Sequence, residues 1–372
     1  MEVITKPSYA RYNIKILKFN EYSTDLRVFD KLMKELNETK SLLDIYDGNK
    51  TYLHFSRNLF PYNGLKYLLE KRYGIKPITN AWLKTYELLW SIKDSLPVEG
   101  TYKAFFNANA PGASTLAAKY FFKQQTKLDF DWVASSYMGG DTTLDDTYGL
   151  IKSNKEKWLM NDTNNGDVRS VANLEDFVDR VGKIDLYFSD IAIDIGNDYS
   201  NEELMEMHEV LGQNITGLCT LATGGTMIVK QRSFLLPFNV WMISYMSNLF
   251  EQFEIHKPTT SRSYNSEVYL VGTGFMGLTE DRCVFLKDLL HNFSRDKAYK
   301  LITKVDNKSI HYISKAATAL VCQQKTAIVT CIDSYKKHHS NLAEFYDSIT
   351  TNMSITRMKF IREHGIVAIK NK

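Results

Sequence analysis

The sequence predicts an α/β fold in which helices cover a parallel sheet, with an irregular N-terminal lobe before it and a helical C-terminal extension after it. Between about residues 80 and 276, helical segments alternate with short apolar strands that end in Gly, Pro or Asn, which is typical of such sheets. The 372 residues are 44% hydrophobic, enough for a sizeable core. We therefore expect three parts, residues 1–79, 80–279 and 280–372.

The two flanking parts are predicted from helical patterns. In the N-terminal lobe, residues 25–43 keep approximately one apolar face, formed by Leu26, Phe29, Leu32, Met33, Leu36 and Leu43. The C-terminal extension contains no convincing strand, and its residues 309–332 and 334–348 are amphipathic. No flexible linker precedes these helices, so we expect them to pack on the sheet domain.

The middle part supplies the sheet. We expect strands at residues 102–106, 131–134, 186–189, 226–230 and 268–272, and helices between them at 114–122, 202–222 and 237–249. In sheets of this kind, ligands bind at the carboxyl ends of the strands. Candidate functional residues are therefore sought there.

The net charge of +3 hides an asymmetry along the chain. Residues 1–100 carry +4, residues 101–280 carry −9 and residues 281–372 carry +8. An acidic middle between basic ends argues against a wholly basic nucleic-acid coat, and leaves room for a polyanion held by the flanks or by local cations.

Cysteine and histidine patterns favour neither a disulfide framework nor a metal centre. The four cysteines form no CxxC or Cys/His cluster, and the eight histidines show no metal-ligand spacing, so we expect reduced thiols and no metal. No signal-peptide pattern begins the sequence, and no window reaches the roughly 18 uninterrupted apolar residues of a membrane helix. We expect a soluble, intracellular protein without a membrane partner.

The turn after the first predicted strand is rich in small residues. From Asn107 to Thr115 it reads NANAPGAST and leads into a helix, an arrangement that allows a ligand to approach the backbone closely. An ordinary strand-to-helix turn explains the string equally well. Because neither GxGxxG nor GxxxxGK[ST] is present, a nucleotide triphosphatase is disfavoured, and a ligand without phosphate, such as S-adenosylmethionine, fits better.

Four further stretches each end in a charged residue. They are NAWLK ending at Lys84, LYFSD ending at Asp190, GGTMIVK ending at Lys230 and KPTTSRSYNSE ending at Glu267. Over residues 78–276 the chain resembles the FtsJ/RrmJ family of RNA ribose 2′-O-methyltransferases, whose signature is a Lys-Asp-Lys-Glu tetrad in this order. The resemblance implies a Rossmann-like, S-adenosylmethionine-dependent methyltransferase sheet, with these four residues as its catalytic site.

Other segments narrow the resemblance to one branch of that family. WVA at 132–134, DDTYGL at 145–150, WL at 158–159 and NGDV at 165–168 are similar to the cap-1 branch, especially its relatives encoded by large cytoplasmic DNA viruses. The implied substrate is capped RNA, methylated on the ribose of the first transcribed nucleotide. Other capping or transcription subunits are candidate partners, and the cytoplasm, a viral factory or the virion is the implied compartment.

The chemistry of methyl transfer explains why two lysines belong together. A ribose hydroxyl is a poor nucleophile that must be positioned in line with the methyl group and must lose a proton. Burial and a second nearby cation both disfavour the charge of a lysine and prepare it as a base. We assign Lys230 as the base. Lys84 would assist it and hold the hydroxyl, while Asp190 and Glu267 would orient the two amines.

The resemblance also implies ligand contacts. For the cofactor they are the backbone around the small-residue turn, the NGDV segment and the catalytic aspartate: Ala108, Asn109, Ala110, Pro111, Gly112, Asp167, Val168 and Asp190. For RNA they are the polar residues before the catalytic glutamate: Lys257, Ser261, Arg262 and Asn265. Phe234 and Tyr264 are weak candidates for stacking on the cap or the first bases, whereas Trp82, Trp132 and Trp158 are expected in the core.

Two departures from the family keep other functions open. Ala108 and Ala113 stand where glycines are usual, and Phe106 replaces an acidic residue near the strand, which weakens the expected cofactor site. A non-catalytic module that binds RNA, a polymerase or a capping subunit is therefore one alternative. Methylation of structured ribosomal or transfer RNA is another. Taken singly, each tetrad residue also has an ordinary reading as surface charge or a turn cap.

Overall fold

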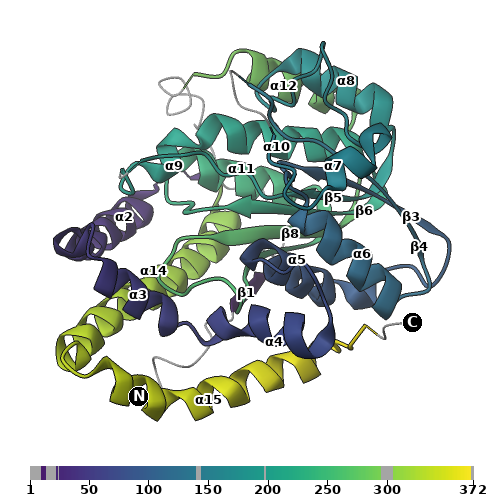
Figure 1. The fold of residues 1–372 in the computed structure, drawn as a ribbon. Helices are drawn as coiled ribbons and strands as arrows, with labels where there is room; N and C mark the ends of the chain where they lie inside the picture. Colours follow the sequence, from purple (N-terminus) through teal and green to yellow (C-terminus); the bar gives the residue numbers. More distant parts are fainter. Residues whose placement is uncertain are drawn as a thin grey trace.

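The computed structural model describes residues 10–13, 22–23, 25–139, 144–196, 198–294 and 305–369. A seven-stranded sheet with the order β1-β7-β8-β6-β5-β3-β4 lies at its centre (Figure 1). Its strands are β1 (Ala10–Asn13), β3 (Thr101–Asn107), β4 (Asp129–Ala134), β5 (Ile184–Ser189), β6 (Leu221–Gln231), β7 (Phe250–Lys257) and β8 (Val268–Phe275). The five strands expected from the sequence are all present.

The prediction of a parallel sheet is only half right. Strands β4, β3, β5 and β6 pair in parallel, whereas β8, β7 and β1 are antiparallel to their neighbours. Strand β7 was not predicted from the sequence. Its residues FEQFEIHK mix charged and apolar types without a continuous apolar run. Glu254 of β7 is nevertheless buried, since its carboxylate lies 2.6 Å from the guanidinium of Arg11 in β1.

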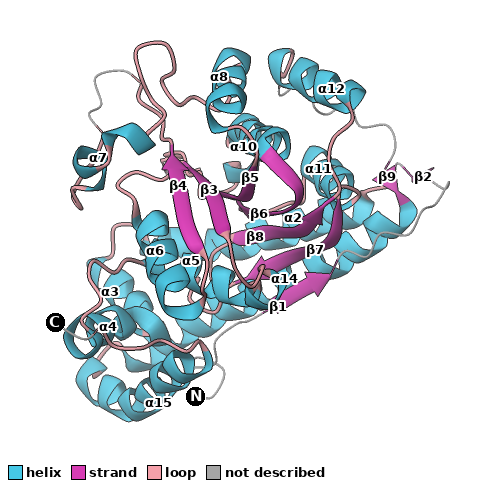
Figure 2. Cartoon of the chain, turned by 90° about the vertical axis from the view of Figure 1, so that its right-hand side faces the viewer, coloured by secondary structure: helices cyan, strands magenta, loops and turns pink. Residues whose placement is uncertain are grey.

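Helices cover both faces of the sheet (Figure 2). Along each strand, alternate residues contribute to the two cores on either side. Phe106, Phe188 and Ile228 pack with α5 (Asn80–Ser91) and α6 (Ala113–Gln125). Their neighbours along the strands, such as Phe105 and Tyr187, pack on the other face. That face is covered by α8 (Val171–Val181), α10 (Met207–Thr220) and α11 (Pro237–Ser247). The three tryptophans expected in the core, Trp82, Trp132 and Trp158, are buried.

The N-terminal lobe is helical over most of its described residues, so its description as irregular is wrong there. It contains α2 (Arg27–Lys40), α3 (Lys50–Asn58) and α4 (Leu65–Tyr73), joined by short 3-10 turns at Ser41–Tyr46 and Pro61–Gly64. The helix expected at 25–43 is α2, and its Phe29, Leu32 and Leu36 are buried. This face of α2 joins the same core cluster as the sheet.

The C-terminal extension is formed by α12 (Glu280–His291), α14 (Asn307–His338) and α15 (Leu342–Glu363), with a two-residue strand β9 (Val305–Asp306) that pairs with β2 (Tyr22–Ser23). The amphipathic segment expected at 334–348 is not one continuous helix. The chain turns after His338, and Asn341 caps α15 by accepting a hydrogen bond from the Glu344 amide. The second helix then runs back along the N-terminal lobe, where Phe345 stacks on Phe55 of α3.

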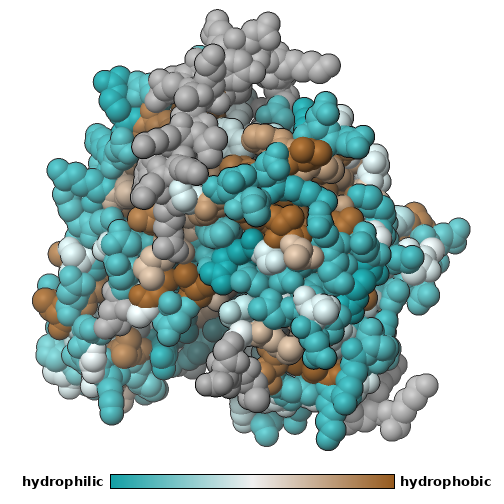
Figure 3. Space-filling view, turned by 90° about the horizontal axis from the view of Figure 1, so that it is seen from above, coloured by the Kyte–Doolittle hydropathy of each residue, from teal (hydrophilic) through white to brown (hydrophobic). Residues whose placement is uncertain are grey.

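Smaller elements complete the described chain. They are the 3-10 turns Lys93–Ser95 and Lys155–Lys157 and the short helices α7 (Leu150–Ser153) and α9 (Glu202–Met205). The helix expected at 202–222 is thus divided into α9 and α10 at Glu206. None of the described helices combines the length and apolarity needed to cross a membrane. From above, hydrophilic residues cover most of the surface, with hydrophobic patches between them (Figure 3).

Candidate active site

The strand register brings the tetrad positions to one edge of the sheet. Asn107 at the end of β3 pairs with Ser189 at the end of β5, and Ser189 pairs with Val229 of β6. The residues that follow them in each strand therefore meet at the carboxyl edge, where Asp190 comes next to Lys230. Strand β8 runs the opposite way, so Glu267 precedes it at the same edge.

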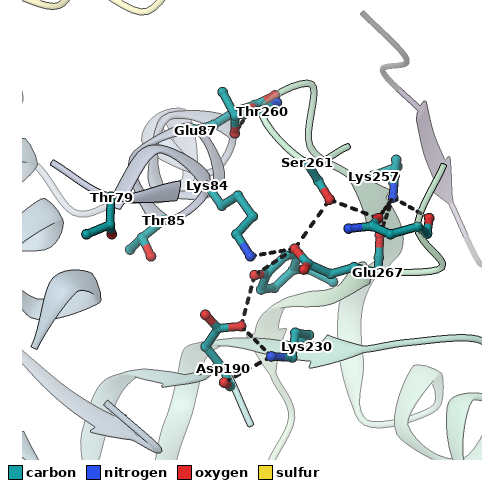
Figure 4. Close-up of polar contacts among 12 residues, drawn as sticks. Thr79, Lys84, Thr85, Glu87, Asp190, Lys230, Lys257, Thr260, Ser261 and Glu267 are labelled. Carbon is teal, nitrogen blue, oxygen red and sulfur yellow. Dashed lines mark hydrogen bonds and ion pairs between the residues drawn. The ribbon is translucent and has the colours of Figure 1, made fainter. Parts of the chain in front are cut away.

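Helix α5 supplies the fourth residue. The side chain of Thr79 caps this helix by accepting a hydrogen bond from the Trp82 amide at 3.1 Å, which fixes where the helix begins. Lys84 lies one turn further along and points at the sheet edge (Figure 4). The structure thus brings together the four tetrad residues that the resemblance singled out.

The tetrad consists of two ion pairs joined by a tyrosine. Lys84 Nζ lies 2.7 Å from Glu267 Oε1, and Lys230 Nζ lies 3.0 Å from Asp190 Oδ1. The hydroxyl of Tyr269 lies 3.1 Å from Asp190 Oδ1 and 3.3 Å from Glu267 Oε1, so its single proton can be donated to either carboxylate. Each buried ammonium therefore has its own counter-charge, and the two pairs share one donor (Figure 4).

Burial and charge set the ionisation of this site. Lys84 and Lys230 are only 9% and 7% exposed. Burial alone would favour the neutral form of Lys84, but the carboxylates of Glu267 and Asp190 outweigh it and raise its pKa above the usual value. Glu267 is partly buried, which opposes its charge, yet Lys84, Lys230 and Lys257 together lower its pKa. The Lys84–Glu267 pair is consequently charged near neutral pH.

The loop before Glu267 is fastened from both sides. Glu87, one turn beyond Lys84 on α5, accepts hydrogen bonds from the amides of Thr259 and Thr260 at 2.7 and 3.0 Å, and from both hydroxyls. On the other side, Lys257 Nζ donates to the carbonyls of Asn265 and Glu267 at 2.9 and 2.8 Å. The position of Glu267 is thus set by α5 and by Lys257.

Two of the expected RNA contacts serve the loop instead. Lys257 is buried, and its ammonium is used by Asn265 and Glu267, so it is not a surface cation for phosphate. Ser261 is buried as well, and its hydroxyl lies 3.3 Å from Glu267 Oε1. Both assignments are corrected for the same reason: a sequence shows the type of a side chain but not its burial.

The other expected RNA contacts lie closer to the surface. Arg262 and Asn265 are partly exposed, and the Arg262 guanidinium lies 6.0 Å from the ring centre of Tyr264. Arg262 is near enough to Lys84 for its charge to oppose that of the lysine. Phe234, by contrast, is buried in the core, so it cannot stack on a base. Tyr264 is partly exposed and packs beside the aromatic cluster of α3 and α15.

The turn after β3 uses its own backbone donors internally. The amides of Ala108, Asn109, Ala110 and Gly112 donate to Asn107 Oδ1, to the Ser135 carbonyl, to Ser136 Oγ and to the Asn109 carbonyl, and Pro111 has no amide proton. Gly112 has φ of 109°, and a Cβ there would meet Leu150, so this position requires glycine. Phosphate binding needs free N–H groups, and between Ala108 and Gly112 every backbone N–H group already has an acceptor in the protein.

Unpaired buried atoms beside this turn fit an amine-bearing ligand. Asn109 Oδ1 and Ser135 Oγ are buried without a hydrogen-bond partner among the described residues. Such atoms are costly unless a ligand or water satisfies them. Both accept hydrogen bonds, and they lie at the ends of β3 and β4. The set therefore suits an amine or a cationic ligand such as S-adenosylmethionine.

The two other cofactor candidates are already engaged in the protein. Both carboxylate oxygens of Asp167 accept from the Arg169 guanidinium, at 2.9 and 2.8 Å, so an adenine amine would have to share them. Although burial opposes it, Arg169 lowers the pKa of Asp167. Val168 is buried with its carbonyl against Gly212 of α10, which turns it toward the core.

Two residues that support the tetrad, Tyr269 and Glu87, were not predicted from the sequence. Tyr269 lies opposite Lys230 in the β6–β8 register, two residues after Glu267 and hence on the same face of the strand. Glu87 follows Lys84 by three residues and so shares its helix face. Both spacings were visible in the sequence, but each becomes informative only once the neighbouring element is known.

Comparisons with known proteins show which family part of the chain resembles. Residues 139–275 match the model of the family described as FtsJ-like methyltransferase. A probable methyltransferase of African swine fever virus is 34% identical over 68% of this chain and 64% of its own length. An uncharacterised protein of Acanthamoeba polyphaga mimivirus is 28% identical over 87% of this chain and 42% of its own length.

A vertebrate relative carries a functional name. The cap-specific mRNA (nucleoside-2′-O-)-methyltransferase 2 of Danio rerio is 26% identical over 74% of this chain and 35% of its own length. The chain spans less than two thirds of the length of each of these relatives. The residues that match the family model include Asp190, Lys230 and Glu267 at the carboxyl edge of the sheet. Residues 139–275 therefore form a domain of the FtsJ-like methyltransferase family.

Proposed function

We propose that this protein is an S-adenosylmethionine-dependent mRNA cap ribose 2′-O-methyltransferase that modifies the first transcribed nucleotide. The observation that carries the proposal is the pair of buried lysines, Lys84 and Lys230, each held by one carboxylate at the carboxyl edge of the sheet. An edge of this kind is where α/β folds bind ligands. Two amines a short distance apart can hold one oxygen and take its proton.

The two lysines have different roles in the proposal. Lys84 stays charged because Glu267 and Asp190 raise its pKa, so its ammonium donates a hydrogen bond to the ribose oxygen. Lys230 is proposed to accept the proton of the 2′-hydroxyl, with Asp190 orienting its amine. When S-adenosylmethionine is bound, its sulfonium would supply the methyl group to the 2′-oxygen, and Lys230 would keep the proton of the hydroxyl.

The cofactor would supply the methyl group from its sulfonium. Asn109 and Ser135 would accept hydrogen bonds from its amines, because their buried oxygen atoms have no partner among the described residues. Asp190 closes the same space, since β3 and β5 are neighbours in register. Its carboxylate would also favour the positive charge of the bound ligand.

The RNA substrate is proposed to enter over Arg262 and Asn265. Both side chains are partly exposed in the loop before Glu267, and a guanidinium is well suited to a phosphodiester. The similarity to the zebrafish enzyme supports a capped substrate. The two viral relatives support an origin in a large DNA virus.

Transfer of a radiolabelled methyl group to matched RNAs tests the proposal. The RNAs are one short sequence in capped and uncapped forms, and nuclease mapping identifies the labelled nucleotide. We expect label only on the capped RNA and only on its first ribose. Label on a later nucleotide, or equal labelling of uncapped or structured RNA, would overturn the cap-1 assignment. Cofactor binding without transfer to any RNA would contradict the enzyme itself.

A further inference from the structure

We propose that Glu206 is a positioning residue for methyl transfer, because its buried carboxylate bridges the two chain segments that carry Asp190 and Lys230. Glu206 lies at the junction of α9 and α10, outside the tetrad, and nothing in the resemblance points to it. The inference rests on the proposed function, since the two segments matter only if Asp190 and Lys230 work together.

The carboxylate of Glu206 has one oxygen on each segment. Oε1 accepts a hydrogen bond from the amide of Ile193 at 3.2 Å, three residues after Asp190. Oε2 lies 3.2 Å from Nε of Arg232, two residues after Lys230. Glu202, one turn earlier, pairs with the same guanidinium. With only 2% of Glu206 exposed, both contacts are shielded from water.

These contacts close a ring through the catalytic pair. Lys230 Nζ bonds the carbonyl of Asp190 at 3.1 Å as well as its carboxylate. The polypeptide runs from Asp190 to Ile193, whose amide donates to Glu206. Glu206 also pairs with Arg232, and the polypeptide joins Arg232 to Lys230. Helix α10 adds a second tie on the same side, because Gln213 Nε2 donates to the Lys230 carbonyl at 2.7 Å.

Burial of Glu206 is costly, since a buried carboxylate costs several kcal/mol unless its partners compensate it. Burial raises the pKa of Glu206 to about 7, while the hydrogen bond from the Ile193 amide and the charge of Lys230 oppose that rise. The contacts of Glu206 come from the Arg232 guanidinium and the Ile193 amide on two different segments, so both are made only when both segments are in place. Displacing one loop would move Asp190 relative to Lys230, and small displacements of reacting groups cost large factors in rate.

Glu203 provides a matched control. It is also a buried carboxylate, one turn away on α9, and it accepts hydrogen bonds from the amides of Leu235 and Leu236 at 3.0 and 2.8 Å. Its contacts therefore hold the segment after β6, beyond Arg232, instead of the loop of Asp190. Loss of Glu203 removes comparable hydrogen bonds without opening the ring.

The test compares Glu206→Ala and Glu206→Gln with Glu203→Ala and Glu203→Gln in the full-length protein. We expect Glu206→Ala to lower kcat about 100-fold, with KM for S-adenosylmethionine nearly unchanged. Glu206→Gln retains an acceptor for Ile193 and should recover about tenfold of that loss. The Glu203 variants should lower the melting temperature similarly while kcat stays within about threefold of the parent.

Hydrogen exchange separates this inference from the proposed function. In Glu206→Ala, amides of residues 190–195 should exchange faster than in the parent and in Glu203→Ala. If the parent protein is inactive on every RNA, the proposed function fails, but unchanged exchange at 190–195 would independently overturn the bridge. With an active parent, the inference would also be overturned if the Glu206 and Glu203 variants changed kcat by the same factor. The same holds if neither set of variants changed kcat.

Discussion

The two halves of the candidate site treat their polar groups in opposite ways. In the tetrad, each buried ammonium faces a carboxylate within 3.0 Å, and Tyr269 links the two pairs. Beside the turn after β3, the buried oxygen atoms of Asn109 and Ser135 lack a partner among the described residues. The charges of the tetrad are paired within the protein, whereas the two oxygen atoms beside the turn leave acceptors that the proposed ligand would satisfy.

The difference follows from what each group costs. An uncompensated buried charge costs more than folding can usually tolerate, so the tetrad must balance its charges internally. A neutral oxygen left unpaired costs only about 1–3 kcal/mol, which a ligand can return on binding. Chemistry and ligand recognition are thus separated, and variants of the two halves should fail in different ways.

The largest expected effect is that of Lys230→Ala. Removing the proposed base should lower kcat by about 10³-fold, while affinity for S-adenosylmethionine stays close to that of the parent. Single-turnover methyl transfer and calorimetric titration measure the two quantities. Lys183→Ala is the control. Lys183 directly precedes β5, at the opposite edge of the sheet, and its ammonium donates to the Cys219 carbonyl. A Lys230→Ala protein that is folded and fully active would refute the assignment.

Glu267→Gln should have the next largest effect, this time on stability. The substitution leaves the Lys84 ammonium buried without its counter-charge, so we expect a loss of about 3 kcal/mol in the free energy of unfolding at pH 7. Because the folded pKa of Glu267 lies below the usual pKa of a glutamate, the difference from the parent should be constant above that usual pKa. It should shrink as the pH falls through the folded pKa. Denaturant titrations across pH check both statements, and a difference that grows in acid would contradict them.

Asn109→Ala probes the other half of the site. It removes one of the unpaired oxygen atoms, so binding of S-adenosylmethionine should weaken about tenfold. Stability should change less than for Glu267→Gln, and the kcat of the saturated enzyme should stay near that of the parent. Unchanged affinity measured by calorimetry would show that Asn109 does not face the ligand.

The smallest effect concerns the backbone of the same turn. Ala108 has φ of 51°, a conformation that costs an alanine about 1 kcal/mol relative to glycine. Ala108→Gly should therefore raise the free energy of unfolding by about that amount. Ala113→Gly is the matched control, because Ala113 begins α6 with helical geometry and glycine there should destabilise by about 0.5–1 kcal/mol. The same sign for both variants would argue against strain at Ala108.

The grouping of the tetrad was predicted from the sequence better than its surroundings. Lys84, Asp190, Lys230 and Glu267 were singled out by the family resemblance, and the structure places them in two neighbouring ion pairs. The assignment of Lys257 failed because residue type alone does not distinguish a surface lysine from one buried beneath a loop. Which side chains support the tetrad depends on contacts between distant segments, and these follow from packing.

The fold shows the same limit. Strands with continuous apolar runs were found, whereas β7 was missed because Arg11 in the distant strand β1 compensates its charged residue Glu254. The turn between α14 and α15 was missed because the amphipathic pattern continues across it. Sequence patterns identified elements that bury one simple face, and they failed where burial depends on a partner far away in the chain.

One measurement tests the central claim most directly: methyl transfer to two capped RNAs that differ only at the first nucleotide, which carries either a 2′-hydroxyl or a 2′-hydrogen. If Lys84 and Lys230 hold and deprotonate a ribose hydroxyl, the first RNA should be labelled and the second should not, with both bound equally well. Equal labelling of the two RNAs would place the methyl group elsewhere and contradict the account.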